Sequence, residues 1–236
     1  TLWYCTQLSW DFKKRISSFL DFTIVSILSG VTSLIMILPT FLDLKTHGEK
    51  LTSVDRLFTE KTWFLDIFAK NFIGSFDTTK YGSIPMIYVG IVPLLLAILF
   101  FTLKSIKFHV KLSYFFLIII FIASFSLERL DLFWQGMHAP NMFLHRYSWL
   151  FSLFIIFLAA ETLQRLKQIK FKNLIISFTI LSIGFILVFV FRKHYDFLGP
   201  VNFILTLEFL LAYLLIFGTF TKSFISKRVF FITTLA

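Results

Sequence analysis

Cysteine, charge and catalytic signature motifs are all scarce in this sequence. The one cysteine, Cys5, excludes an internal disulfide and a metal site ligated by several cysteines. Only 15% of the 236 residues are charged, and no P-loop, dinucleotide-binding fingerprint, HExxH motif or nucleophile elbow occurs. These absences exclude disulfide-stapled scaffolds and the enzyme classes that those motifs define.

Apolar side chains dominate what is present. Hydrophobic residues make up 57% of the chain, 34 residues are Phe, and the mean hydropathy is +0.83. A soluble domain of this length has too little interior to bury that much apolar surface. The net charge of +10 does not indicate a nucleic-acid partner, because the basic residues stand at the ends of apolar runs. We expect the lipid bilayer as partner, whose anionic inner leaflet attracts each basic residue by roughly 1 kcal/mol.

The apolar runs predict an all-α fold, a polytopic transmembrane helix bundle that forms one domain over residues 1–236. A spanning helix needs about 20 mostly apolar residues. A further run, Val229–Ala236, would begin a seventh helix, so the chain reads as an internal piece of a larger membrane protein. The six predicted spans are Ile16–Leu42, Ile84–Leu103, Leu112–Leu127, Tyr147–Leu163, Leu174–Phe191 and Val201–Phe220.

Charge divides the loops into two kinds. Residues 43–80 carry six basic and six acidic residues, and residues 128–146 carry two of each. Thirteen of the 23 Lys and Arg residues lie instead in clusters at 13–15, 104–111, 165–172 and 222–228. Positive residues are held on the cytoplasmic side of a membrane. We therefore predict a multi-pass protein of the bacterial cell membrane, with the clusters inside and the loops at about 43–83 and 128–146 outside.

The first outer loop, about 40 residues long, contains a helical pattern in Lys61–Gly74. Phe64, Phe68 and Phe72 recur every four residues, and Asp66 and Lys70 are spaced to pair on the other face. This pattern predicts a short interfacial helix in the headgroup plane, or a surface helix packed on the bundle. In the second span, Pro93 predicts a kink.

Arg146 stands at the outer N-terminus of the fourth predicted span. The helix dipole disfavours a cation there, which makes Arg146 a candidate for binding an anion, and its planar fork suits phosphate. The alternative is an interfacial arginine that reaches lipid headgroups within an aromatic belt of Trp134, Tyr147 and Trp149.

Other polar residues give weaker signals. His138 and His145 are separated by Pro140 and do not form a helical metal pair, so we predict no metal site. Solvated loop charges are the favoured reading of Glu128 and Asp131, and a general base is the alternative. Glu208 lies within the sixth span, where a carboxylate is costly and suggests a function or a pairing with a residue such as Arg192. The polar segment 75–85 reads equally as a turn-rich loop or a sugar- or phosphate-binding loop.

Three stretches of the sequence are distinctive in combination. Lys80–Leu96 combines Gly, Pro and Tyr residues with a Leu-Leu-Leu ending, Trp134–Ala160 contains Pro140-Asn141 and Arg146-Tyr147-Ser148, and Ser29–Thr40 ends in Leu-Pro-Thr. In this order and spacing, the three stretches resemble segments of the YfhO family of bacterial membrane proteins. Two residues depart from the family pattern: His145 replaces an aromatic residue and Leu144 replaces a proline.

The resemblance implies a glycosyltransferase of the GT-C type. Such an enzyme takes a sugar from a polyprenyl-phosphate carrier at the outer face and adds it to a cell-surface polymer, here a teichoic-type acid. The family's catalytic carboxylate would lie before Thr1, so the general base is unknown and this stretch alone is expected to be inactive. No cofactor is implied, and dependence on a divalent metal stays open.

Six residues are predicted to contact substrate. Arg146 would bind the lipid phosphate with help from Lys80 or His145, and Tyr81, Trp134 and Asn141 would contact sugar or acceptor. The alternatives are a transporter or flippase of a lipid-linked envelope precursor, and a non-catalytic scaffold of an envelope complex. The few ionisable groups within the spans favour an enzyme over a transporter.

Overall fold

The computed structural model of the chain describes residues 12–47, 56–59, 62–75, 84–138 and 144–221. All regular structure in these ranges is helical. The α-helices are α2 (Phe12–His47), α3 (Asp66–Ala69), α4 (Ile91–Thr102), α5 (Phe108–Ser126), α6 (Glu128–Trp134), α7 (Ser148–Leu163), α8 (Phe171–Val190) and α9 (Pro200–Thr221). Two 3-10 helices, η1 (Leu166–Gln168) and η2 (Arg192–His194), follow α7 and α8.

The predicted helical membrane bundle is confirmed. Four helices have the length and hydropathy to cross a bilayer: α2 through Ile16–Asp43, α5, α8 and α9. The second and fourth predicted spans form the shorter apolar helices α4 and α7, of 12 and 16 residues. The predicted seventh run, Val229–Ala236, lies outside the described residues.

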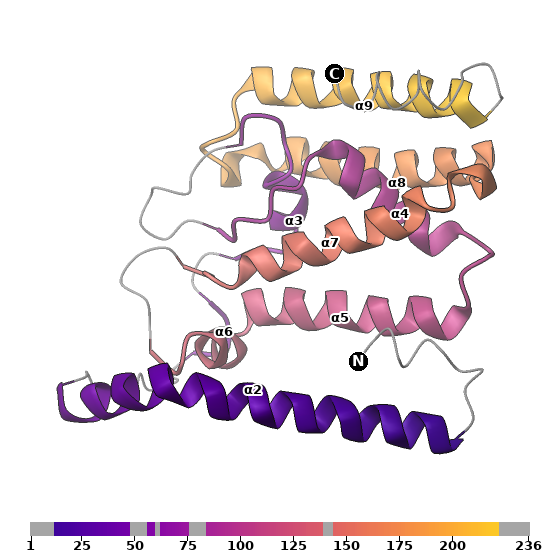
Figure 1. Cartoon of the computed structure of the whole chain (residues 1–236). Coiled ribbons are helices and arrows are strands. Elements are labelled where there is room, and N and C mark those ends of the chain that lie inside the picture. The colour runs from indigo at the N-terminus through magenta and orange to yellow at the C-terminus, as the bar shows by residue number, and fades with distance from the viewer. Residues whose placement is uncertain (1–11, 48–55, 60–61, 76–83, 139–143, 222–236) are drawn as a thin grey trace.

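Helix α4 forms the centre of the bundle and packs on α7, α8 and α9 (Figure 1). Leu95 and Leu99 on α4 are fully buried. Two polar side chains fasten α4 to its neighbours: the Thr162 hydroxyl donates to the Leu96 carbonyl at 3.0 Å, and the Asn173 amide donates to the Thr102 carbonyl at 3.3 Å. Such bonds help helices to associate in a membrane, because lipid is as apolar as the helix surfaces and the hydrophobic effect does not drive them together. Among the side chains that the structure describes in the apolar part of helix α2, none is buried in this core.

The second predicted span is a discontinuous segment, not a kinked helix. Residues 84–90 form no regular secondary structure, and α4 begins only at Ile91, after Gly90 with its φ of +84°. Pro93 therefore falls in the first turn of α4, where a missing N–H breaks no helical hydrogen bond. The predicted kink is wrong for this reason.

Side chains from two other segments form hydrogen bonds with backbone groups of the non-helical residues 84–90. The Asn71 amide donates to the Ile87 carbonyl at 3.4 Å, and its oxygen accepts the Val89 N–H at 3.1 Å. The Ser148 hydroxyl donates to the Met86 carbonyl at 3.1 Å. Non-helical backbone at membrane depth is tolerated only when protein buries and pairs it in this way.

The prediction of an interfacial helix over Lys61–Gly74 is wrong. Only Asp66–Ala69 is α-helical, turns continue to residue 74, and the segment is buried against α8. Asp66 and Lys70, expected on a polar face, are 4% and 2% exposed. The predicted periodicity failed because groups elsewhere in the bundle cover this second face: the Tyr195 hydroxyl donates to Asp66, and the Phe197 ring lies against the Lys70 ammonium.

Both ends of the bundle match the predicted division of charge. In Figure 1 the start of α2, the α4–α5 turn and the α7–α8 turn all lie at the right, and they carry the described basic clusters. Residues 56–59, 62–75, 127–138, 144–147 and 191–199 lie at the opposite end, called here the loop end. The grouping of the loops is thus confirmed, and the membrane side that each end faces stays a prediction.

Candidate functional site

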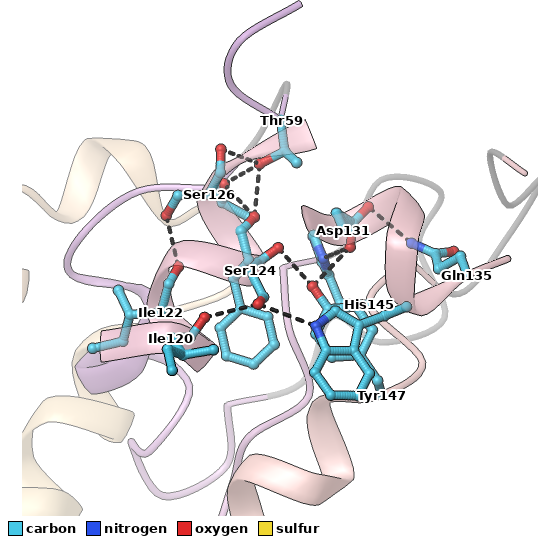
Figure 2. Close-up of polar contacts among 12 residues, drawn as sticks. Thr59, Ile120, Ile122, Ser124, Ser126, Asp131, Gln135, His145 and Tyr147 are labelled. Atoms are coloured by element: carbon cyan, nitrogen blue, oxygen red, sulfur yellow. Dashed lines mark hydrogen bonds and ion pairs between the residues drawn. The ribbon is translucent and has the colours of Figure 1, made fainter. Parts of the chain in front are cut away.

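Two segments far apart in the sequence join at the loop end. Phe58 forms an antiparallel bridge with Leu127, and the Thr59 N–H donates to the Ser126 carbonyl at 3.0 Å. The Thr59 hydroxyl also donates to the Phe125 carbonyl at 2.8 Å (Figure 2). Residues of the first predicted outer loop therefore hold the C-terminal end of α5 and the start of α6 in place.

Asp131 on α6 is the centre of a polar network beside this junction (Figure 2). Its Oδ1 lies 2.7 Å from His145 Nδ1 and accepts the Tyr147 hydroxyl at 2.9 Å. Its Oδ2 accepts the Gln135 amide at 2.8 Å. Asp131 and His145 are 7% and 3% exposed. A buried carboxylate is stable only with such donors, and charge-assisted bonds are the strongest available.

An aromatic stack forms one wall of the network. The Trp134 ring stacks on Tyr147 with 5.3 Å between centroids, and Tyr147 stacks on Phe125 at 5.5 Å. The Trp134 indole N–H donates to the Ser124 hydroxyl at 3.1 Å, which fixes the orientation of the ring. Trp134 remains 39% exposed with the Phe121 ring also stacked beside it at 6.1 Å between centroids, so part of its surface is open to a ligand.

Arg146 is held between two anchored neighbours. His145 and Tyr147, on either side of it, both bind Oδ1 of Asp131. His145 has a φ of +57°, a conformation that costs a non-glycine residue about 1 kcal/mol or more. The Asp131 bond offsets that cost. This short arch exposes the side chain of Arg146 at the start of α7, where a guanidinium can bind a planar or tetrahedral anion bidentately.

The structure thus gathers three of the six predicted substrate-binding residues: Trp134, His145 and Arg146. The other three, Lys80, Tyr81 and Asn141, lie outside the described residues. Within the described ranges, no three His, Cys, Asp or Glu residues are grouped closely enough to hold a metal ion. Glu208 lies exposed on α9 and lines neither the Asp131 network nor the aromatic stack.

The prediction for Asp131 was wrong, since the favoured reading made it a solvated loop charge and the structure buries it. A signal was present in the pattern Leu127, Asp131 and Trp134, which places the carboxylate on the apolar face of a short helix. Glu128 is the more superficial of the two acids, and its Oε2 accepts the Arg56 N–H at 2.8 Å.

A second buried acid lies near the turn between α8 and α9. Asp66 Oδ1 accepts the Tyr195 hydroxyl at 2.9 Å and Oδ2 accepts the Trp63 N–H at 2.7 Å. Burial raises the pKa of Asp66, and these hydrogen bonds oppose that rise. Burial also lowers the pKa of Lys70 to about 8, with the charge of Asp66 opposing the change. The Lys70 ammonium lies 5.2 Å from the centroid of the Phe197 ring.

The family model described as "Bacterial membrane protein YfhO" matches residues 1–236. Because the match covers the whole chain, the chain belongs to that family of membrane proteins, as the three resembling stretches suggested. No curated protein and no solved structure gives a significant match.

Proposed function

We propose that this member of the YfhO family transfers a sugar from a polyprenyl-phosphate carrier to a cell-surface polymer such as a teichoic-type acid. The reaction would take place at the loop end of the bundle, facing the outside of the cell. Family membership and the apolar helices establish a multi-pass membrane protein. The sugar-transfer chemistry is the proposal.

The observation that supports it most is the double anchoring of Arg146. One carboxylate oxygen binds the side chains before and after Arg146, so the backbone that carries the exposed Arg146 side chain is fixed before a ligand arrives. In an inverting transfer, the acceptor oxygen forms a bond to the anomeric carbon as the bond to the phosphate oxygen breaks. The leaving phosphate keeps the electron pair, and a preorganised cation stabilises its growing charge. A general base would take the acceptor's proton, and we assign none among the described residues.

The neighbouring residues have different roles in this proposal. The exposed part of the Trp134 ring suits the apolar face of a sugar ring. His145 is buried and its Nδ1 bonds to Asp131, which makes it a positioning residue for Arg146 rather than a direct sugar contact. Lys80, Tyr81 and Asn141 remain proposed contacts to phosphate, sugar or acceptor.

The described core favours an enzyme over a transporter. A transporter or flippase needs polar groups that continue from one face of the membrane to the other. The helix contacts around α4 are made mainly by apolar side chains such as Leu95, Leu99 and Phe100. The polar networks described above lie at the loop end.

A transfer assay with the full-length protein in proteoliposomes tests the proposal, using polyprenyl phosphate that carries a radiolabelled sugar. Arg146→Ala should lower kcat/KM about 100-fold or more, the usual loss when one transition-state donor is removed. Arg146→Lys should recover part of that loss, because it keeps the charge without the planar fork. Arg129→Ala, an exposed arginine on neighbouring α6, is the matched control and should transfer normally.

Three outcomes would count against the proposal. Normal transfer by Arg146→Ala removes this residue from the mechanism. If the wild type moves the labelled lipid across the membrane without passing its sugar to an acceptor, the protein is a flippase. Absence of both activities in the complete protein would favour a scaffold.

A further inference from the structure

An apolar groove of about 400 Å³ lies between α8 and α9, towards the loop end. Its side chains come from four parts of the fold: the buried segment after α3, the second half of α8, η2 and the first half of α9. The lining residues used below are Phe72, Phe185, Phe189, Arg192, Ile204 and Leu207.

Arg192 is the charged residue of this groove. Its guanidinium carbon lies 5.2 Å from the centroid of the Phe189 ring, which itself lines the groove. Lys193 and His194 follow it in η2, and all three side chains are exposed. A cavity with apolar walls and a cationic rim matches the chemistry of a lipid with an anionic headgroup.

The position of these cations is unusual for the predicted topology. The turn between α8 and α9 is short and carries Arg192 and Lys193 against one acid, Asp196. Basic residues in short loops are normally kept on the cytoplasmic side, whereas this turn lies at the end opposite the basic clusters (Figure 1). The C-terminal dipole of α8 favours an adjacent cation. That effect falls off within a turn, so a bound anion explains the second cation better.

The groove and the Asp131 network lie on different sides of the bundle. The network is built on α5, α6 and the start of α7, and the groove is built on α8 and α9. Helices α4 and α7 lie between them (Figure 1). A lipid phosphate held at Arg192 is therefore not the phosphate proposed to leave at Arg146.

We propose that the groove binds one anionic phospholipid of the surrounding bilayer. Its phosphate contacts Arg192 and Lys193, and one acyl chain lies along Phe189, Ile204 and Leu207. The lipid would brace the buried outer segment, because Phe72 lines the groove and the Trp63 ring lies 5.1 Å from Phe191 beside η2. This proposal depends on the predicted topology but not on sugar transfer, so either can fail without the other.

Native mass spectrometry of the full-length protein, reconstituted in nanodiscs of phosphatidylglycerol and phosphatidylcholine, tests this site. The wild type should retain one phosphatidylglycerol more tightly than the rest. The double variant Arg192→Gln/Lys193→Gln should weaken that retention about 30-fold, which corresponds to about 2 kcal/mol for two surface cations. Lys167→Gln/Lys170→Gln, with two exposed lysines at the opposite end, is the matched control and should retain the lipid.

A second variant tests the groove without changing charge. Ile204→Trp should fill the cavity and displace the lipid while Arg192 and Lys193 remain. Thermal unfolding in nanodiscs gives a readout that a purely structural role would not change: the stability of the wild type should rise with the phosphatidylglycerol fraction, and that of the charge variant should not.

Three results would overturn the proposal. Equal retention of phosphatidylglycerol by the wild type and Arg192→Gln/Lys193→Gln would show that the cations bind no lipid. Preferential displacement of the lipid by added polyprenyl phosphate would assign the groove to the sugar carrier. Displacement by inorganic phosphate alone, with Ile204→Trp having no effect, would reduce the site to a surface anion contact.

Discussion

The pairing of Asp131 with His145 can be measured by a double-mutant cycle. Both groups are buried and their contact atoms lie 2.7 Å apart. Hydrogen bonds to a charged group contribute about 1.5–3 kcal/mol to stability. We therefore expect a coupling free energy of that size between Asp131→Asn and His145→Ala, with the double variant less destabilised than the sum of the two single variants.

The structure explains why the losses of stability in the two single variants should not add in the double variant. Asp131→Asn leaves His145 buried without its charged acceptor, and His145→Ala leaves the carboxylate with only Tyr147 and Gln135. Each single change thus carries the cost of an unsatisfied partner, which the double variant avoids. A cost of 1 kcal/mol corresponds to roughly 2–4 °C in a chain of this size. Each single variant should therefore unfold about 3–12 °C below the wild type.

Unfolding of the purified protein in detergent, followed by heat and by SDS titration in mixed micelles, gives the three differences required. Glu128→Gln is the control, since this carboxylate lies on the same short helix but contacts Arg56 and not His145. Its coupling with His145→Ala should be close to zero. A coupling below about 0.5 kcal/mol for Asp131 and His145 would refute the reasoning, and with it the anchoring of Arg146.

Three further predictions concern the bundle. Gly184→Ala should destabilise by about 1–3 kcal/mol in thermal unfolding, because a methyl group there would overlap the Phe68 ring, whereas Gly30→Ala, with nothing within 4 Å, should cost nothing. Asn71→Leu should cost about 1–3 kcal/mol and speed amide exchange at residues 87–89, since the amide bonds to the non-helical backbone there; unchanged exchange would refute this. Burial lowers the Lys70 pKa from 10.5 to about 8, so the unfolded chain binds more protons between these values and wild-type stability should rise with pH in that window. Lys70→Met should be more stable than the wild type at pH 7, by up to roughly 3 kcal/mol, and that advantage should vanish by pH 10.5; an advantage independent of pH would contradict the assignment.

The sequence alone predicted the fold class and the grouping of the loops, because both depend on composition and on the order of residues along the chain. Apolar length predicted the membrane bundle, because every lipid-exposed backbone group must be paired inside its own helix. Charge predicted which turns share an end, and the described turns do so. Arg146 was singled out by its place at the start of a span and Trp134 by the aromatic residues around it, which are local features, and their contact with substrate stays a prediction.

The same reasoning failed where the chain departs from regular helix. Pro93 and Gly90 lie in an apolar run that periodicity reads as one helix, yet residues 84–90 before α4 form no regular secondary structure. That conformation is stable only because Asn71, from another segment, satisfies its backbone. No pattern within residues 84–103 contains that information.

Only the tertiary structure shows which polar side chains are buried and form hydrogen bonds with one another. Asp131 is 14 residues from His145 and Asp66 is 129 residues from Tyr195 in the sequence. Periodicity shows which face of a helix a residue occupies, but not how that helix is rotated against its neighbours. The sequence therefore determined a membrane bundle with its polar residues gathered at one end. Helix packing turned those residues into a buried network, because a carboxylate can leave water only where other segments bring it donors.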